Sequence, residues 1–219
     1  MPNHVWNKIV AENICDLPIF STKTDEYGNA GTQLDFNTII PEPEDLEDVA
    51  SGLHEDRAIG WLLNRMFKSE AMRYSRDLIR AEKLFEFMNV SRVPADKPKD
   101  LEKYILNIIR TGEPSWYYWR RRHWGTKWNA YKTKIIDKDT IAFKTAWNPV
   151  PKIIETMMVK FRIPKIDYSW VSEEYSENGR AIYHYGGPIT HCMLPLDEHG
   201  VPYLYEELFG YKVYDDEEE

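Results

Sequence analysis

Alternating hydrophobic and polar positions predict a β-strand close to the start of the chain. Residues 4–11 are rich in β-branched and aromatic side chains, and an extended backbone places Val5, Asn7 and Ile9 on one side. The next segment, residues 12–33, combines Pro and Gly with Ser, Thr and Asp, a composition typical of a loop. The chain therefore begins with one strand and a long connection.

The second half of the chain contains further strand patterns. Residues 133–137 and 140–147 predict a β-hairpin, and residues 166–170 alternate as another strand. The dipeptide Asn178-Gly179 is typical of a two-residue hairpin turn, and it leads into a strand through Ala181 and Tyr183. Four strands are thus expected after residue 130.

Helical spacing of hydrophobic residues predicts helices between these strands. Three apolar stripes lie in residues 58–67, 71–88 and 101–109. The third is the best marked, because Glu102 complements the dipole at its start and Gly112 suits the position after its end.

Two more helices are expected in the second half of the chain. Asn148 suits an N-cap and Pro149 a first helical position, with an apolar stripe behind them that Pro164 ends. Residues 203–209 predict a short last helix.

The order strand, helices, hairpin, helix, strand, strand predicts an α+β fold. A ferredoxin-like split βαβ sheet with an added strand and helices on one face accounts for it economically. We expect one domain over residues 1–219, with an enlarged helical insertion at about 55–112 and a disordered acidic tail at 215–219.

Composition narrows the class of protein. The net charge of −8 and pI near 5.4 argue against general binding to DNA or anionic membranes, and fit an acidic protein whose partner is basic. Cys15 and Cys192 are too far apart to form a disulfide framework, which predicts buried, inert thiols in a reducing compartment. Since no signal peptide or membrane-spanning pattern is present, we expect a soluble, cytoplasmic protein.

One stretch has the opposite character. Residues 116–134 contain four Trp, three Tyr, six Lys or Arg and no acid. This combination predicts stacking on bases and pairing with phosphates. The candidate binding residues are Trp119, Arg120, Arg121, Arg122, Trp124, Lys127, Trp128 and Tyr131. The alternative is structural, with the tryptophans packed between the helical block and the sheet and the arginine stems beneath solvated heads.

Sequence motifs for catalysis and metal binding are missing. His184, His191, Cys192 and His199 have no zinc-site spacing, and the chain contains no phosphate-binding loop, dinucleotide fingerprint or serine elbow. We therefore predict no catalytic residues, no metal and no cofactor. A phosphate-directed hydrolase remains the enzymatic alternative, because scattered active sites leave no local motif.

Several motifs together resemble one family. They are MPNHVWNKI at the start, DFNTIIPEPE from residue 35, WGTKWNAY from 124, FKTAWNPVP from 143 and IDYSWVSEEYSENGRAIYHYGG from 166. This combination resembles the Api92-like proteins, whose domain is called the YubB ferredoxin-like domain and which occur on bacteriophages, plasmids and other mobile elements. The resemblance implies the fold and a bacterial cytoplasm, and it brings no catalytic residues.

The resemblance also implies a function class. Small accessory proteins of phages and plasmids often counter host defences, so we expect a non-enzymatic protein that binds a host factor, a defence component among them. The contact would be the ring-rich stretch or the acidic sets at 42–48, 206–207 and 215–219. The alternative is binding or sequestration of a nucleotide or single-stranded nucleic acid by residues 116–134.

Overall fold

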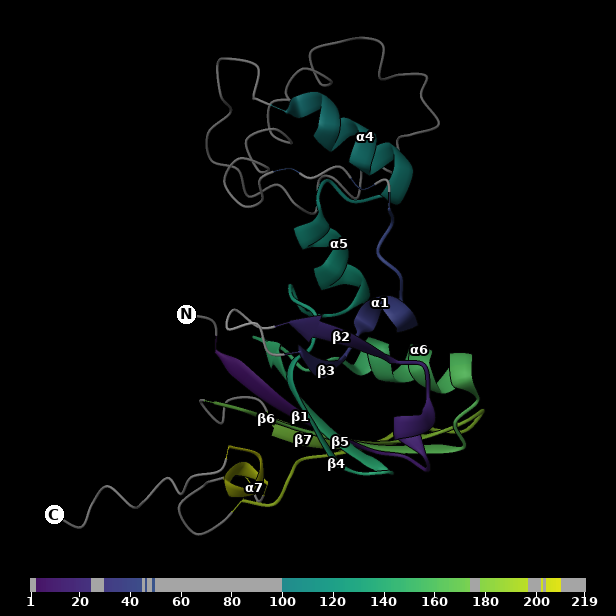
Figure 1. The fold of residues 1–219 in the computed structure, drawn as a ribbon, viewed down its shortest axis with the longest axis vertical. Coiled ribbons are helices and arrows are strands. Elements are labelled where there is room, and N and C mark those ends of the chain that lie inside the picture. The colour runs from purple at the N-terminus through teal and green to yellow at the C-terminus, as the bar shows by residue number, and fades with distance from the viewer. Residues whose placement is uncertain are drawn as a thin grey trace, which may run out of the picture. The chain divides into compact units, whose positions relative to one another are not determined.

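The computed structural model describes residues 3–24, 30–44, 46, 49, 100–173, 178–196, 202 and 204–209 (Figure 1). It divides into two compact units, residues 42–120 and the remainder. The predicted stripes at 58–67 and 71–88, most of the predicted insertion and the acidic tail lie outside the described residues.

The larger unit is built on an antiparallel six-stranded sheet. Its strands lie in the order β4-β5-β1-β6-β7-β8. Their bounds are β1 (His4–Val10), β4 (Tyr131–Asp137), β5 (Thr140–Ala146), β6 (Lys165–Ser172), β7 (Asn178–His184) and β8 (Thr190–Cys192). The first four of this order, with helix α6 (Pro151–Phe161) between β5 and β6, have the split βαβ topology of a ferredoxin-like fold. The predicted α+β fold is confirmed, with two strands rather than one added beside β6.

The two faces of the sheet bury different residues. Strand β1 turns Val5, Asn7 and Ile9 to one face, as its alternation predicts, and all three are fully buried. Helix α6 covers this face (Figure 1), and the apolar stripe of the helix is buried. On the opposite face, Trp6 packs with Leu208 of helix α7 (Tyr205–Phe209), so helices cover both faces and not one.

Residues 12–33 are not the predicted loop. They contain a short 3-10 helix η1 (Ile14–Asp16) and a two-stranded hairpin of β2 (Phe20–Thr24) and β3 (Ala30–Leu34). The strand runs are only five residues long and rich in Ser, Thr and Gly, so their alternation is weak. Fully buried Ile19 and Leu34 anchor the hairpin, and helix α1 (Phe36–Ile39) follows it.

Helix α6 starts two residues later than its sequence predicts. Val150 is the N-cap and Pro151 the first helical residue, so the second proline of the Pro-Val-Pro sequence takes the favoured position. The side chain of Asn148 instead donates to the carbonyl of Gly125 at 3.2 Å. The helix ends at Arg162, which has a left-handed φ of 54°.

Asn178-Gly179 is a strand start and not the predicted turn. Gly179 pairs with Trp170 across β6 and β7, and a Cβ atom at Gly179 would lie 2.5 Å from the indole of Trp170. The glycine is therefore explained by the ring that lies across it, because any side chain would displace that ring.

In the smaller unit, helix α4 (Leu101–Thr111) confirms the third apolar stripe. Leu101 and Tyr104 pack with Val49, and Gly112 closes the helix with a left-handed φ of 81°. Helix α5 (Trp116–His123) follows it in the chain.

Candidate functional site

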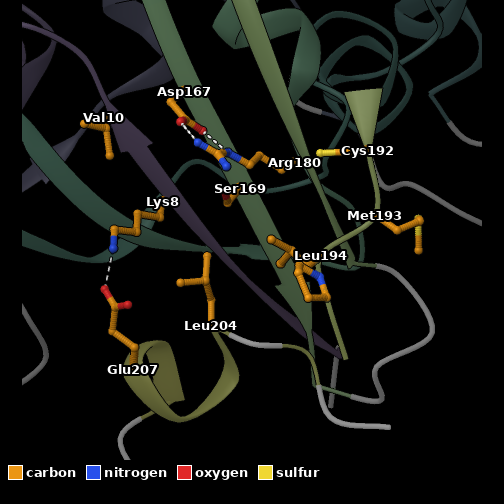
Figure 2. Close-up of a pocket in the computed structure, with 11 residues that line it drawn as sticks. Lys8, Val10, Asp167, Ser169, Arg180, Cys192, Met193, Leu194, Leu204 and Glu207 are labelled. Atoms are coloured by element: carbon orange, nitrogen blue, oxygen red, sulfur yellow. Dashed lines mark hydrogen bonds and ion pairs between the residues drawn. The ribbon is translucent and has the colours of Figure 1, made fainter. Parts of the chain in front are cut away.

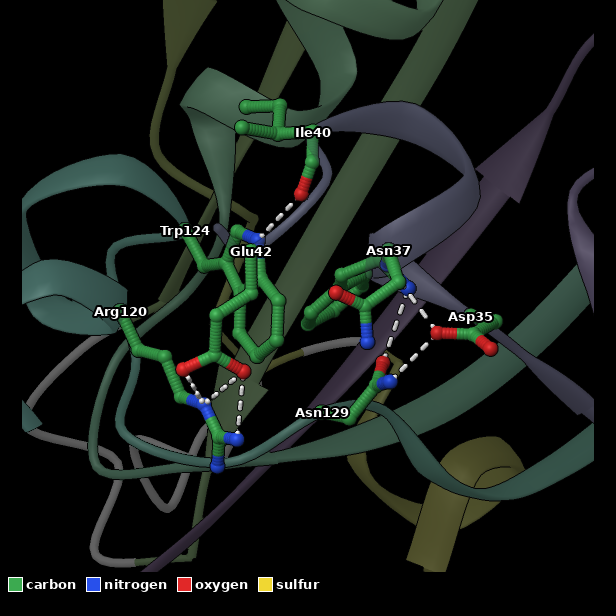
Figure 3. Close-up of polar contacts among 8 residues, drawn as sticks. Asp35, Asn37, Ile40, Glu42, Arg120, Trp124 and Asn129 are labelled. Atoms are coloured by element: carbon green, nitrogen blue, oxygen red, sulfur yellow. Dashed lines mark hydrogen bonds and ion pairs between the residues drawn. The ribbon is translucent and has the colours of Figure 1, made fainter. Parts of the chain in front are cut away.

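The eight predicted binding residues are divided between the two units. Trp119 and Arg120 belong to the unit of residues 42–120, and the other six belong to the larger unit. Trp119 is only 4% exposed. The guanidinium of Arg120 holds Glu42 with three hydrogen bonds, of which the one from Nη2 measures 2.6 Å (Figure 3). Arg120 therefore supports the fold of its own unit, and the ring of Trp119 is buried.

Trp124 is a core residue of the larger unit. Its side chain is 1% exposed, and its indole N–H donates to the carbonyl of Ile40 at 2.9 Å (Figure 3). Its ring meets Phe36 edge-on, with 5.8 Å between centroids. For Trp119 and Trp124 the hypothesis of a stacking surface is wrong. A ring packed on both faces has none left for a base.

Asn129 fixes the segment that follows Trp124. Its Oδ1 accepts the backbone N–H of Phe36 at 2.9 Å, and its Nδ2 donates to Asp35 at 2.6 Å (Figure 3). Asp35 in turn caps helix α1 by accepting the backbone N–H of Asn37. These bonds hold the backbone beside Lys127 and Trp128 in place.

Three of the predicted residues come together with two that the sequence did not single out. We define the ring–cation patch as His4, Lys127, Trp128, Tyr131 and Trp147. The ammonium of Lys127 lies 4.2 Å from the ring centroid of Trp128 and 5.9 Å from that of Trp147. Trp128 is 38% and Trp147 47% exposed, so both indoles offer surface to a ligand while they flank one cation.

Trp147 is held in an unusual backbone conformation. It follows the last residue of β5 with a φ of 72°, in the left-handed region that a bulky residue rarely adopts. Its backbone N–H donates to the carbonyl of Asn3 at 2.9 Å. Such strain persists where the surroundings enforce it and concentrates at binding sites. In the sequence, the position of Trp147 is marked by the Trp-Asn-Pro motif at the end of a predicted strand.

Tyr131 and His4 form the floor of the patch. The Tyr131 hydroxyl lies 3.1 Å from the carbonyl of Thr145 and 2.6 Å from Nδ1 of His4. Burial, with a smaller contribution from Glu173, raises the pKa of Tyr131 to about 12, so the hydroxyl keeps its proton. Burial and then Lys144 lower the pKa of His4, which keeps the imidazole neutral at pH 7.

The surroundings of the patch are basic. Residues 121–165 contain eleven Lys or Arg and three Asp or Glu, although the whole chain carries −8. Burial and then Lys132 lower the pKa of Lys144, while Glu173 acts in the opposite direction. Arg121 is exposed and Arg122 half-buried. The patch can therefore offer both indole faces and cations to an anionic ligand.

The described residues contain no group of three or more His, Cys, Asp and Glu that would hold a metal ion. The prediction of two buried thiols is wrong, because Cys15 is half-buried and Cys192 is exposed. Cys192 lies in the short outer strand β8, which leaves it accessible. No helix among the described residues is long and apolar enough to cross a membrane.

The sheet order and the patch define a ferredoxin-like protein with an aromatic, basic surface at one end of its sheet. Residues 123–218 match the family model described as the ferredoxin-like domain in Api92-like protein. This match confirms the resemblance of residues 123–218 to the ferredoxin-like domain of Api92-like proteins, which the sequence motifs predicted. The matched range leaves out β1, which supplies a central strand of the sheet.

Among solved structures, the chain is similar to a crystal structure of a protein Api92 from Yersinia pseudotuberculosis. The two are 10% identical with a TM-score of 0.42, over 89% of this chain and 99% of that one. A search of curated proteins gave no match.

Proposed function

We propose that the chain is a non-enzymatic binding protein of a bacterial mobile element, that it acts in the cytoplasm, and that it binds single-stranded nucleic acid or nucleotides at the ring–cation patch. The observation that carries this proposal is the pair of exposed indoles, Trp128 and Trp147, whose ring centroids lie 4.2 Å and 5.9 Å from the ammonium of Lys127. Indoles stack on bases of any identity, and lysines pair with the phosphates between them.

The basic segment around the patch supports the same ligand. Lys132 and Lys144 act electrostatically on His4, whereas Glu173 acts in the opposite direction and accepts the backbone N–H of His4 at 3.1 Å. The remainder of the chain is acidic and would repel nucleic acid. Binding is therefore local, and it is expected to weaken steeply with added salt.

Fluorescence titration with a short single-stranded oligonucleotide tests the proposal. Since each stacked base contributes about 1–3 kcal/mol, Trp128→Ala should weaken binding roughly 5- to 150-fold. Trp147→Asn should weaken it comparably without loss of stability, because Asn tolerates the left-handed φ. Lys127→Met should reduce the slope of log K against log salt by about 0.7.

Tyr185→Ala and Lys138→Met are the matched controls. Tyr185 is a ring with similar exposure at the end of β7, and Lys138 is an exposed lysine in the β4–β5 turn. Both should bind like the wild type. Binding that survives all three patch variants, or no binding at low salt, would exclude the patch as a nucleic-acid site.

A host protein is the second candidate partner. Strand β4 is an edge strand, and its consecutive Ile135 and Ile136 are 51% and 52% exposed. Exposed apolar residues on a sheet edge favour a protein contact. A mobile-element protein with such an edge would engage a host factor, a component of a defence system among them.

Affinity capture from host lysate tests this second candidate. The wild type should recover a defined protein that the Ile136→Lys variant loses, while Val159→Lys, which alters an exposed residue of α6, should retain it. Equal recovery by all three chains would rule out the edge of β4 as the contact.

A further inference from the structure

A cavity lies on the sheet face opposite helix α6. It has a volume of about 440 Å³, within the range of small-molecule sites. Strands β1, β6 and β7 supply its floor, and Leu194, Pro195 and two residues from the α7 region supply its walls (Figure 2). It shares no residue with the ring–cation patch.

The floor carries a row of polar residues across four strands. Lys8 is directly opposite Ser169, Ser169 is opposite Arg180, and Arg180 is opposite Cys192. Neighbouring strands are about 4.8 Å apart, so the backbones of Lys8 and Arg180 are roughly 10 Å apart with the Ser169 hydroxyl between them. All four residues line the cavity. Two cations on either side of a hydroxyl can hold a small anionic group.

Both cations already have a carboxylate partner and keep unused donors. Lys8 forms an ion pair with Glu207 of α7, and Nε of Arg180 donates to Asp167 at 2.7 Å (Figure 2). An ammonium has three N–H donors and a guanidinium five, so one carboxylate does not exhaust either group. The four charges sum to zero. A bound anion therefore adds uncompensated charge, and its desolvation costs more for a dianion than for a monoanion.

The rest of the lining is apolar. Leu194 and Leu204 are buried at the wall, and the partly exposed Val10 and Met193 lie at the rim. A ligand that fills this cavity must therefore combine a small anionic head with an apolar body.

We propose that the cavity binds an amphipathic monocarboxylate. Its carboxylate lies over Ser169 between Lys8 and Arg180, and its apolar body packs against Leu194 and Leu204. The donors of the polar row hold the head group, and burial of the apolar body supplies most of the affinity. This site is independent of nucleic-acid binding at the patch.

Calorimetric titration of the full chain with decanoate tests the site. We expect saturable binding of one decanoate per chain, with decanol and decyl phosphate at least tenfold weaker. Arg180→Met should weaken decanoate binding about tenfold or more, and Arg180→Lys should restore part of it. Lys138→Met, a lysine variant outside the cavity, should bind like the wild type.

Thiol alkylation gives a second readout on the unmodified chain. Cys192 stands at the end of the polar row, whereas burial raises the pKa of Cys15, which lies elsewhere. Decanoate should slow alkylation of Cys192 and leave Cys15 unchanged. Decanol binding as tightly as decanoate, no saturable binding by the wild type, or full binding by folded Arg180→Met and Ser169→Ala would each overturn the proposal.

Discussion

Replacing Trp124 with alanine should lower the free energy of unfolding of the larger unit by about 3–5 kcal/mol. The indole is 1% exposed, packs edge-on against Phe36, and donates its N–H to the carbonyl of Ile40. Truncation leaves a cavity and also removes the donor from a buried carbonyl, and both effects destabilise. Since the free energy of unfolding of a domain is only about 5–15 kcal/mol, the variant should lose a large part of its stability.

Urea denaturation followed by circular dichroism measures this loss. Trp128→Ala is the matched control, because it deletes the same side chain four residues away at an exposed position. It should change stability by less than about 1 kcal/mol. If the two variants were equally stable, the assignment of Trp124 to the core would be wrong.

The difference between these two tryptophans shows a property that the sequence alone does not predict, the burial of each ring. The stretch of residues 116–134 was identified by its composition, but composition does not tell which rings are buried. Burial of Trp124 depends on Phe36 and Ile40, more than eighty residues earlier in the chain.

The fold was more predictable because its signals are local. Alternation along β1 and β6 and the apolar stripe of α6 each lie within a dozen residues, and these elements are enough for the split βαβ order. Where the predictions were wrong, contacts between distant parts of the chain determined the local structure. Gly179 is opposite a tryptophan rather than in a turn, and the hairpin of β2 and β3 depends on buried Ile19 and Leu34.

The patch became visible only through the sheet register. His4 and Trp147 are 143 positions apart in the sequence, yet strand β1 begins where β5 ends. Tyr131 reaches the same place because it is opposite Lys144 at the start of β4. A site assembled from strand ends is hidden in the linear chain, whatever the strength of its individual motifs.

The second large effect is expected at Asn7, at the centre of the sheet. Its side chain is fully buried, and both its amide nitrogen and its amide oxygen form hydrogen bonds. Its Nδ2 donates to Val5 at 3.0 Å and to the Thr145 hydroxyl at 2.9 Å, and its Oδ1 accepts the Tyr168 hydroxyl at 2.6 Å. Burial raises the pKa of Tyr168, which keeps that hydroxyl a donor, and it in turn accepts the backbone N–H of Val150.

Asn7→Asp should destabilise the larger unit strongly at neutral pH. The new carboxylate would be buried opposite two acceptor oxygens, with no donor to offer them. Burial raises a carboxyl pKa by as much as about 3–5, and from an unfolded pKa of about 3.9 the resulting loss of stability at pH 7 is about 4 kcal/mol. The same change at exposed Asn37 should alter stability by less than about 0.5 kcal/mol.

The pH dependence of the unfolding free energy distinguishes the cost of a buried charge from the cost of lost packing. Because the carboxyl pKa of the folded variant lies above its unfolded value of about 3.9, the folded state binds the extra proton. The difference in unfolding free energy between Asn7→Asp and the wild type should therefore be smallest below about pH 4. It should grow as the pH rises above about 4 and level off once the pH has passed the folded pKa. Chemical denaturation at several pH values measures it, and a difference that does not change with pH would mean that lost packing, not buried charge, destabilises the variant.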